Sequence, residues 1–467
     1  CGMSHEKNII AIATPAGAGA VSIIRVSGSD AWSLVAAQFK SVRDKDLLKQ
    51  KSHSIHLGHI TDGDKVIDQV LVSLFKGPNS YTGENVVEIN CHGSSYIQQE
   101  ILQLFLRKGC KMAEGGEFTL RAFLNGKLDL SQAEAVADLI ASDNAAAHQI
   151  AMQQMRGGFS SEIKALRQEL LNFASLIELE LDFAEEDVAF ADREAFRKLL
   201  EKIAKVLRQL IDSFALGNVI KNGIPVAIVG APNAGKSTLL NALLNEERAI
   251  VSDIAGTTRD TIEDEISIGG IGFRFIDTAG IRDTQDQIEQ LGIAKTFEKI
   301  EQAQLVVYMI DLKKCHDDLA VITADAAALQ KLKETYPKKP LLVLGNKADL
   351  ISETALAKIK ETITDLSPLS AKEKEGIESL KEAFLNVVHT GALHNNDTIV
   401  SNSRHYDALL RAQEEIGKVQ DGLAAGLSSD LMAIDIRQAL YHFGEITGEI
   451  SSDELLGNIF ANFCIGK

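Results

Sequence analysis

The sequence contains few cysteines and no long apolar segment, and both shortages limit what the protein can be. Its five cysteines are odd in number and scattered, without a C-x-x-C pair: Cys1, Cys91, Cys110, Cys315 and Cys464. This pattern excludes a disulfide framework and a cysteine zinc site. No stretch approaches the roughly eighteen apolar residues of a membrane span, and the N-terminus lacks the apolar core of a signal peptide. We therefore expect a cytoplasmic protein that does not contact a membrane.

The sequence has no excess of positive charge: 65 acidic residues outnumber 48 basic ones, and the formal net charge is −17. Broad, nonspecific nucleic-acid binding depends on Lys and Arg neutralising phosphates. Any RNA contact must therefore be confined to a local patch or shared with a partner. The 467 residues are enough for two or three domains.

A strand-to-helix turn carries a complete phosphate-loop sequence, Gly230-Ala-Pro-Asn-Ala-Gly235-Lys236-Ser237. The apolar run 224–229 before it predicts a strand, and 238–244 after it predicts a helix. The two glycines let backbone N–H groups surround phosphate oxygens at the start of that helix. We therefore expect Lys236 to reach the β- and γ-phosphates of a nucleotide, and Ser237 to bind Mg²⁺.

A second motif, Asn346-Lys347-Ala348-Asp349, follows the buried-strand pattern 341–345 and identifies the base. A carboxylate can accept hydrogen bonds from both N1–H and the exocyclic amine of guanine, a donor pair that adenine lacks. A site built around such bonds rejects an analogue that leaves them unpaired. The tripeptide Ser370-Ala371-Lys372 stands where GTPases place a backbone contact to the base. The sequence therefore predicts GTP as the substrate.

Two segments between these motifs complete the GTPase pattern. The strand pattern of residues 273–277 ends in Asp277, placed to hold Mg²⁺ through water, and Gly280 can donate its N–H to the γ-phosphate. Upstream, the hydroxyl of Thr258 can complete the Mg²⁺ shell while GTP is bound. Ras-type GTPases carry a water-orienting Gln directly after the Asp-x-x-Gly motif, but here Ile281 occupies that position, after Gly280. A replacement must come from elsewhere, and the sequence alone leaves four polar candidates: Arg282, Asp283, Asp286 and Glu289.

The remaining chain predicts a multidomain α/β protein. Residues 1–120 combine short apolar strands with Gly/Pro turns and predict an α+β domain. Residues 121–217 carry apolar side chains at helical spacing and few turn signals, and residues 389–467 are helical again. The Ras-like GTPase domain, residues 218–388, is therefore expected to be inserted into one all-α helical domain. Two separate helical modules are the alternative.

The motifs together resemble those of the MnmE (TrmE) family of tRNA-modification GTPases. The resemblance rests on Gly256-Thr-Thr-Arg-Asp260, Asn233 and the terminal Cys464-Ile-Gly-Lys467. It is extended by Tyr81-Thr-Gly83-Glu84 and by the segment 121–135, so that it covers essentially the whole chain.

The resemblance implies an N-terminal domain that binds tetrahydrofolate, in its 5-formyl or 5,10-methylene form, and that mediates homodimerisation. With an FAD-dependent partner, MnmG (GidA), in a heterotetramer, the family installs an aminomethyl or carboxymethylaminomethyl group at C5 of the wobble uridine of certain tRNAs. By motif, the folate contacts are Arg25, Glu88, Lys127 and Lys467. Cys464 matches the terminal cysteine of the family.

The resemblance also implies GTPase domains that dimerise across their nucleotide faces with K⁺ beside the phosphates. The K⁺ ligands would be Asn233, Ser252, Ile254 and Thr257, and Glu289 would orient the attacking water. A fixed cation can do the electrostatic work of an arginine finger. The nucleotide and ion contacts that follow by motif are Asn233, Ala234, Gly235, Lys236, Ser237, Thr238, Ser252, Asp253, Ile254, Ala255, Gly256, Thr257, Thr258, Asp277, Thr278, Ala279, Gly280, Asn346, Lys347, Asp349, Ser370, Ala371 and Lys372.

Two other functions compete with this one. A ribosome-assembly GTPase of the Era type shares the phosphate loop and the guanine motif, but it would have a KH domain with a G-x-x-G loop and a basic C-terminal region. A nonenzymatic scaffold that binds folate and a partner, with GTP as a structural ligand, is the third possibility.

Overall fold

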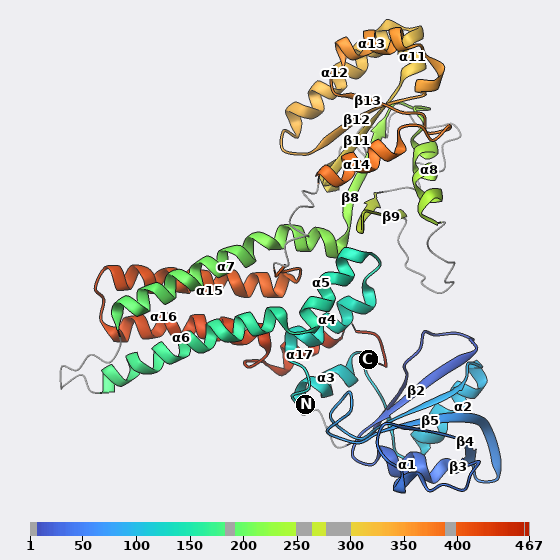
Figure 1. Cartoon of the computed structure of the whole chain (residues 1–467), viewed down its shortest axis with the longest axis vertical. Coiled ribbons are helices and arrows are strands. Elements are labelled where there is room, and N and C mark those ends of the chain that lie inside the picture. Colours follow the sequence, from blue (N-terminus) through green and yellow to red (C-terminus); the bar gives the residue numbers. More distant parts are fainter. Residues whose placement is uncertain are drawn as a thin grey trace. The chain divides into compact units, whose positions relative to one another are not determined.

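The computed structural model describes residues 7–182, 192–248, 264–276, 300–387, 398–461 and 463–466. Its contacts divide the chain into two compact units, whose elements are labelled in Figure 1. Unit 1 comprises Cys1–Ala141, Ala151–Gln209 and Arg404–Lys467, and unit 2 comprises Ser142–Ile150 and Leu210–Ser403.

Unit 1 begins with an α+β sheet region and continues into helices. Its elements are β1 (Ile9–Ile12), β2 (Val21–Ser27), α1 (Ala31–Gln38), β3 (Phe39–Ser41), η1 (Leu47–Lys49), β4 (Ser54–Asp62), β5 (Lys65–Phe75), β6 (Val86–His92), α2 (Ser95–Arg107), β7 (Lys111–Met112), α3 (Glu117–Leu124), α4 (Leu130–Ala141), α5 (Ala145–Met155), α6 (Gly158–Asp182), α7 (Arg193–Asn222), α15 (Ser403–Ala424), α16 (Ser429–Thr447) and α17 (Asp453–Phe460), where α5, α7 and α15 cross the boundary between the units.

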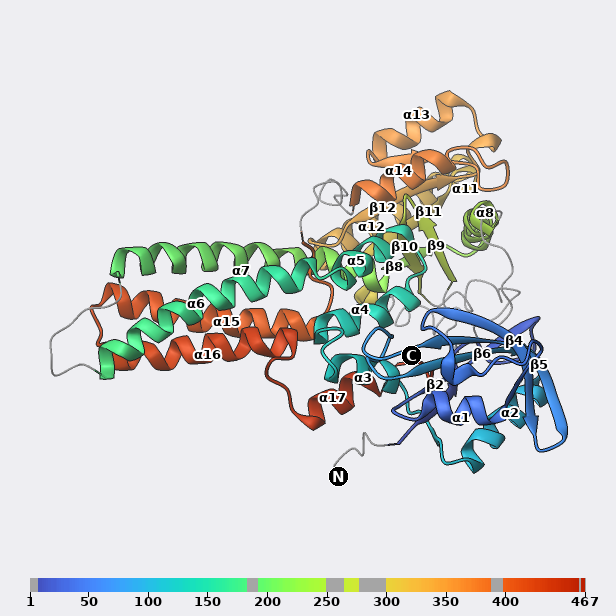
Figure 2. The same ribbon diagram turned by 60° about the horizontal axis from the view of Figure 1, so that its bottom comes forward.

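The sheet of unit 1 has seven strands in the order β3-β4-β5-β6-β2-β1-β7. Helices α1 and α2 cover one of its faces (Figure 2), because both contribute to a single apolar core with alternate residues of the central strands. In β2, for example, Ile24 and Val26 are buried in this core, whereas Arg25 between them points to the other face. The alternation therefore places Arg25 and its strand neighbours away from the helices.

The helical part of unit 1 is a bundle in which α6, α7, α15 and α16 run side by side (Figures 1 and 2). Buried apolar residues recur at helical spacing on α6 and again on α15, as the sequence predicts. The bundle thus combines helices from both sides of the intervening segment, which confirms that the GTPase-like segment is inserted into one helical domain.

Unit 2 contains a doubly wound, mostly parallel sheet. Its elements are β8 (Ile224–Gly230), α8 (Lys236–Arg248), β9 (Asp264–Ile268), β10 (Ile271–Phe275), β11 (Leu305–Asp311), α11 (Leu312–Asp317), α12 (Leu319–Thr335), β12 (Leu341–Asn346), η3 (Ala348–Leu350), α13 (Glu353–Thr362), β13 (Leu366–Pro368) and α14 (Ile377–Val387). The strand order is β13-β12-β11-β8-β10-β9, and only β9 pairs antiparallel with its neighbour.

Both faces of this sheet are buried, as parallel sheets require. Along β11, Leu305, Val307 and Met309 enter the core beside α8 and α14, while Val306, Tyr308 and Ile310 enter the core beside α12 and α13. The start of α5 also belongs to unit 2, because Ala146 donates its backbone N–H to Gly270 O at 2.9 Å. Sequence spacing assigned this segment to the helical domain.

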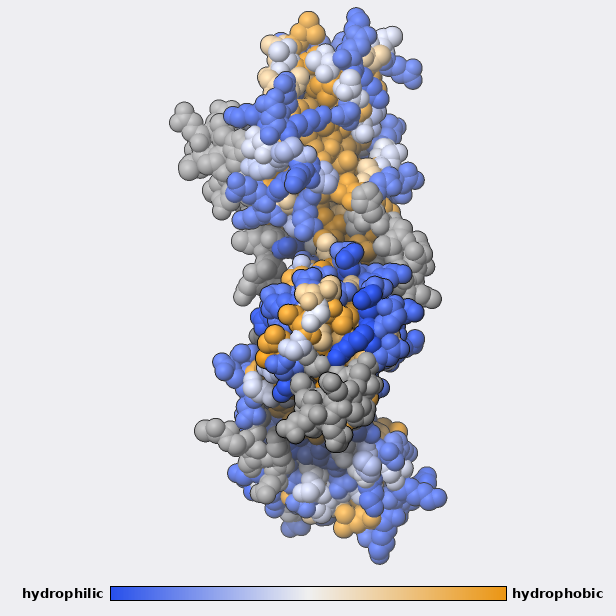
Figure 3. All heavy atoms as spheres, turned by 90° about the vertical axis from the view of Figure 1, so that its left-hand side faces the viewer, coloured by the Kyte–Doolittle hydropathy of each residue, from blue (hydrophilic) through white to orange (hydrophobic). Residues whose placement is uncertain are grey.

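The mixed architecture of α+β region, helical bundle and doubly wound sheet confirms the expected fold class. The boundaries at residues 120, 217 and 388 stay predictions. Among the described residues, no helix is both long and apolar enough to cross a bilayer. Hydrophilic side chains cover much of the face shown in Figure 3, with hydrophobic ones in smaller patches.

Candidate functional site

The phosphate loop connects the end of β8 to the start of α8, and its backbone requires both glycines. Gly230 has φ of +146° and Gly235 has φ of +98°. A Cβ added to Gly230 would lie 2.3 Å from Met309 O, and one added to Gly235 would lie 2.1 Å from Asn346 Nδ2. The loop is therefore packed tightly against the ends of the neighbouring strands, and no side chain fits at either position.

The ammonium group of Lys236 is bonded to the loop itself. The Nζ of Lys236 donates to Gly230 O at 2.7 Å and to Ala231 O at 3.1 Å, so the ammonium group lies against the loop carbonyls. Ser237 is half-buried in the first turn of α8, whereas Asn233 is exposed and has a left-handed backbone with φ of +64°. A helix N-terminus, a curled loop and a lysine at one point are what an anionic phosphate group requires.

Asn346 ties the phosphate loop to the guanine-motif loops. Its Nδ2 donates to Ala234 O at 2.8 Å, and its Oδ1 accepts from the backbone N–H of Ala371 at 3.0 Å. The side chain is 4% exposed. The structure therefore brings together three of the motifs that sequence spacing selected, at the carboxyl edge of adjacent parallel strands where such folds bind ligands.

The base-side residues lie on the loops after β12 and β13. Asp349 is exposed on η3, and the loop containing buried Ser370 is closed by a bridge between Ser370 and Glu375, with N···O distances of 3.0 and 3.1 Å. Lys372 is exposed, and its Nζ lies 3.8 Å from Oε1 of Glu373 in the same loop. An outward carboxylate beside a fixed backbone turn is the arrangement that a guanine base needs.

Several predicted site residues lie outside the described part of the chain. They are Ser252, Asp253, Ile254, Ala255, Gly256, Thr257, Thr258, Asp277, Thr278, Ala279, Gly280, Glu289 and Lys467. Their roles as Mg²⁺, K⁺, water or folate contacts stay predictions.

A second polar cluster lies on the sheet of unit 1. Arg25 pairs with Glu88 directly across β2 and β6, with Nε···Oε1 at 2.9 Å and Nη2···Oε1 at 2.8 Å. The guanidinium group lies over the rings of Tyr81 and Phe118, at 5.3 and 5.5 Å from their centroids. Motif comparison selected the two charged residues as folate contacts. It included Tyr81 only as part of the Tyr81-Thr-Gly83-Glu84 motif, and it did not select Phe118, which belongs to no motif.

The C-terminal segment joins this cluster. Arg25 Nη1 donates to Gly466 O at 3.1 Å, and Ile465 forms an antiparallel bridge with Gly115. Burial raises the pKa of Tyr81, whose hydroxyl hydrogen-bonds to Thr119 Oγ1 at 2.8 Å. Lys127 is exposed and donates to Pro78 O at 2.9 Å. The N-terminal sheet and the C-terminal residues 465–466 thus meet at the guanidinium group of Arg25.

The family models match two parts of the chain. The model described as "MnmE helical domain" matches residues 130–464, and that described as "GTP-binding protein TrmE N-terminus" matches residues 8–127. The chain is 68% identical to the tRNA modification GTPase MnmE of Flavobacterium psychrophilum, over 100% of both chains. It is 52% identical to that of Bacteroides thetaiotaomicron, over 99% of this chain and 100% of the relative.

The chain belongs to the MnmE family.

Among solved structures, the FeoB G-domain from Methanococcus jannaschii matches 35% of this chain and 97% of its own length, at 29% identity and a TM-score of 0.25. Membership of the MnmE family confirms the resemblance expected from the motifs, and it agrees with a chain whose phosphate and guanine motifs meet at one edge of a parallel sheet.

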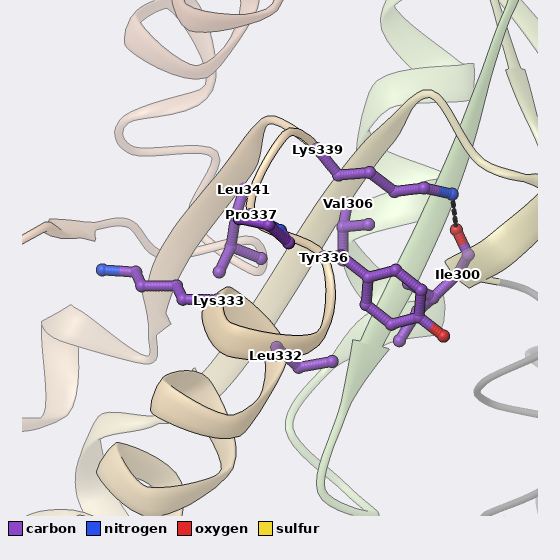
Figure 4. A pocket seen from close by; sticks show the side chains of 8 residues that line it. All are labelled: Ile300, Val306, Leu332, Lys333, Tyr336, Pro337, Lys339 and Leu341. Carbon is purple, nitrogen blue, oxygen red and sulfur yellow. Dashed lines mark hydrogen bonds between the residues drawn. The ribbon is translucent and has the colours of Figure 1, made fainter.

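An apolar pocket in unit 2 is unrelated to that edge (Figure 4). It is lined by residues near the amino ends of β11 and β12, by the end of α12 and by Ile300, whose backbone oxygen accepts from Lys339 Nζ. Because parallel strands share one direction, this pocket lies at the edge of the sheet opposite to the phosphate loop. In this MnmE-family chain, the pocket is therefore separate from the edge where the phosphate and guanine motifs meet.

Proposed function

We propose that this MnmE-family GTPase hydrolyses GTP in a cycle that K⁺ stimulates and that dimerisation of unit 2 activates. With an FAD-dependent partner, MnmG, it modifies C5 of the wobble uridine of certain tRNAs with a one-carbon unit from tetrahydrofolate. The structural observation behind this proposal is the pair of hydrogen bonds by which the Asn346 side chain joins the phosphate loop to the Ser370 loop, here called the Asn346 clamp. The relatives that match the full length of the chain are named tRNA modification GTPases.

Among the described residues, Lys236, Ser237 and Asp349 support the proposed nucleotide binding, while Thr258 and Asp277 enter by motif alone. Lys236 would leave the loop carbonyls to meet the phosphates, because an anionic oxygen is a stronger acceptor than a neutral carbonyl. Asp349 would accept from N1–H and the amine of guanine. Ser237 and Thr258 would hold Mg²⁺, with Asp277 bound through water. Mg²⁺ neutralises charge that develops between the β- and γ-phosphates.

The replacement for the missing Gln is proposed from the family pattern. Asn233, Ser252, Ile254 and Thr257 would hold K⁺, and Glu289 would orient the attacking water. The exposed, left-handed position of Asn233 supports this assignment, since its side chain is not committed to the core of unit 2.

Asn233→Ala is expected to lower the K⁺-stimulated kcat on the order of 100-fold, toward the rate in Na⁺, because the cation loses a ligand where transition-state charge develops. The measurement is GTP turnover in matched K⁺ and Na⁺ buffers. Asn222→Ala, a change to an exposed asparagine at the end of α7, is the control and should keep full stimulation. A wild type with equal rates in both buffers would refute the K⁺ assignment.

Folate binding is proposed for the cluster around Arg25. The guanidinium group of Arg25 suits the oxygen atoms of a folate, and the carboxylate of Glu88 suits its pterin amines. The rings of Tyr81 and Phe118 lie next to the same guanidinium group. Lys127 and Lys467 would contribute further positive charge. This combination of aromatic and charged groups favours a flat, polar heterocycle with an acidic tail.

Homodimerisation is proposed through the outer face of β4 and β5. Ile55, Leu57 and Leu71 are exposed there, and the last two lie directly opposite each other. Leu57→Glu is expected to shift the full chain from dimer to monomer in sedimentation at micromolar concentration, because it places a charge inside the apolar contact. Leu48→Glu, at an exposed leucine on η1, should leave the dimer intact. A dimer that survives Leu57→Glu contradicts this choice of face.

The activity on tRNA is tested by analysing wobble uridines from a strain that lacks the gene. Modification should be lost, restored by the wild-type chain, and not restored by Arg25→Gln if folate supplies the carbon. Unchanged tRNA modification in the deletion strain would favour an Era-type ribosome-assembly role instead. Restoration by Arg25→Gln would reject only the folate contact.

A further inference from the structure

Lys347, the second residue of the guanine motif, adopts an uncommon backbone conformation. Its φ is +65°, in the left-handed region that non-glycine residues rarely occupy. The residue precedes η3, and its backbone oxygen accepts from Leu350 at 3.1 Å. Because Asn346 and Asp349 lie on either side, the conformation of Lys347 fixes how these two motif residues are oriented relative to each other.

The side chain of Lys347 is held by an acidic residue that the motifs do not include. Its Nζ lies 2.6 Å from Oδ2 of Asp311, the last residue of the neighbouring strand β11. Asp311 is 4% exposed, whereas the Lys347 side chain is 34% exposed. The two strands are in register here, since Asp311 pairs with Asn346. The ion pair therefore spans the sheet edge directly beside the phosphate loop.

The carboxylate of Asp311 is itself held in a fixed orientation. Its Oδ1 accepts from the backbone N–H groups of Lys313 and Lys314, at 3.1 and 3.2 Å, and thereby caps α11. Oδ1 thus caps the helix, while Oδ2 accepts a hydrogen bond from Lys347. From the same turn, Lys314 Nζ reaches Pro232 O of the phosphate loop at 3.5 Å. The start of α11 touches both nucleotide-binding loops.

We propose that Asp311 is a positioning residue of the guanine site, which acts through Lys347. The buried carboxylate holds the lysine side chain along the sheet edge. It thereby keeps the left-handed turn that places Asn346 for its bonds to Ala234 and Ala371 and leaves Asp349 exposed for the base. This inference rests on the proposed function of unit 2 as the GTP-binding unit. An ordinary buried ion pair would stabilise the fold equally with and without nucleotide, whereas a positioning residue affects guanine binding beyond its effect on the fold.

The test uses two aspartates that both cap helices. Asp311→Asn keeps an oxygen that can accept from the helix N–H groups but removes the charge facing Lys347. Asp318→Asn is the matched control, because Asp318 caps α12 through Ala320 at 2.9 Å and is exposed. In the full-length chain, dissociation of a fluorescent GDP should be at least tenfold faster in Asp311→Asn and unchanged in Asp318→Asn. Thermal midpoints without nucleotide separate this effect from stability.

Two further variants test whether Asp311 acts through Lys347. If Asp311 acts through Lys347, GDP should dissociate from the double variant Lys347→Met/Asp311→Asn no faster than from Lys347→Met alone. Equal GDP dissociation from Asp311→Asn and the wild type overturns the proposal, and so does a multiplicative effect in the double variant. A wild type that binds no guanine nucleotide would instead overturn the proposed function, so the two failures are distinguishable.

Discussion

Replacing Asn346 with alanine is expected to weaken GTP binding by roughly 30-fold or more. The substitution removes a donor from Ala234 O and an acceptor from the N–H of Ala371, and both partners are buried. Each buried group left without its hydrogen bond costs about 1–3 kcal/mol, and 1.4 kcal/mol corresponds to a factor of ten in affinity. The phosphate loop and the Ser370 loop would then no longer be held in one arrangement.

The affinity for GTP is measured by titration calorimetry of the full chain, and the stability of unit 2 by its thermal midpoint. Ser352→Ala serves as a control, since Ser352 caps α13 through Ala355 at 3.3 Å and does not contact the motifs. It should lower the midpoint slightly and leave the affinity unchanged. Affinity within threefold of the wild type in Asn346→Ala would contradict the clamp.

The meeting of the phosphate and guanine motifs at one edge of the sheet could be predicted because each motif is local in sequence. Lys236 and Asn346 follow strands whose apolar runs are recognisable, and parallel strands bring their carboxyl ends to one edge. Asp311 ends a strand of the same kind, but an aspartate after a strand is too common to select. Its partner, Lys347, becomes apparent only from the pairing of β11 with β12.

The cluster around Arg25 shows why the other contacts could not be predicted. The hydrogen bond from Arg25 to Gly466 joins residues 441 positions apart. The rings of Tyr81 and Phe118 come from two further segments of the chain. No periodicity relates segments that meet only through tertiary packing. The assignment of residues 142–150 to unit 2 has the same cause, because a helix pattern shows which side chains are buried but not which core receives them.

A buried ion cluster joins the two parts of the helical domain that flank the insertion. Glu134 of α4 accepts from Arg404 Nε at 2.8 Å and lies 2.7 Å from His405 Nε2. Arg404 also donates to Ile446 O at 3.0 Å, so that α4, α15 and α16 meet at this point. Burial alone would raise the pKa of Glu134, but its pairing with His405 and Arg404 outweighs burial and lowers it to about 2.

Glu134→Gln is expected to lower the free energy of unfolding of unit 1 by about 3–5 kcal/mol at neutral pH, because it leaves Arg404 without its carboxylate in a buried site. Urea unfolding followed by the fluorescence of the single tryptophan, Trp32, reports on this unit. The matched control is Glu169→Gln, whose exposed pair with Lys202 should contribute about 1 kcal/mol or less.

The pH dependence provides a separate check. Because the pKa of Glu134 is lower in the folded state, the unfolded state binds more protons below about pH 4.5, and the stabilising contribution declines as the pH falls toward 2. The difference between wild type and Glu134→Gln should therefore shrink as the pH falls below about 4.5. A difference no larger than that of Glu169→Gln at pH 7 would mean that packing alone holds the two parts together. A large difference would mean that an ion cluster between residues 270 positions apart keeps the bundle intact around the inserted unit.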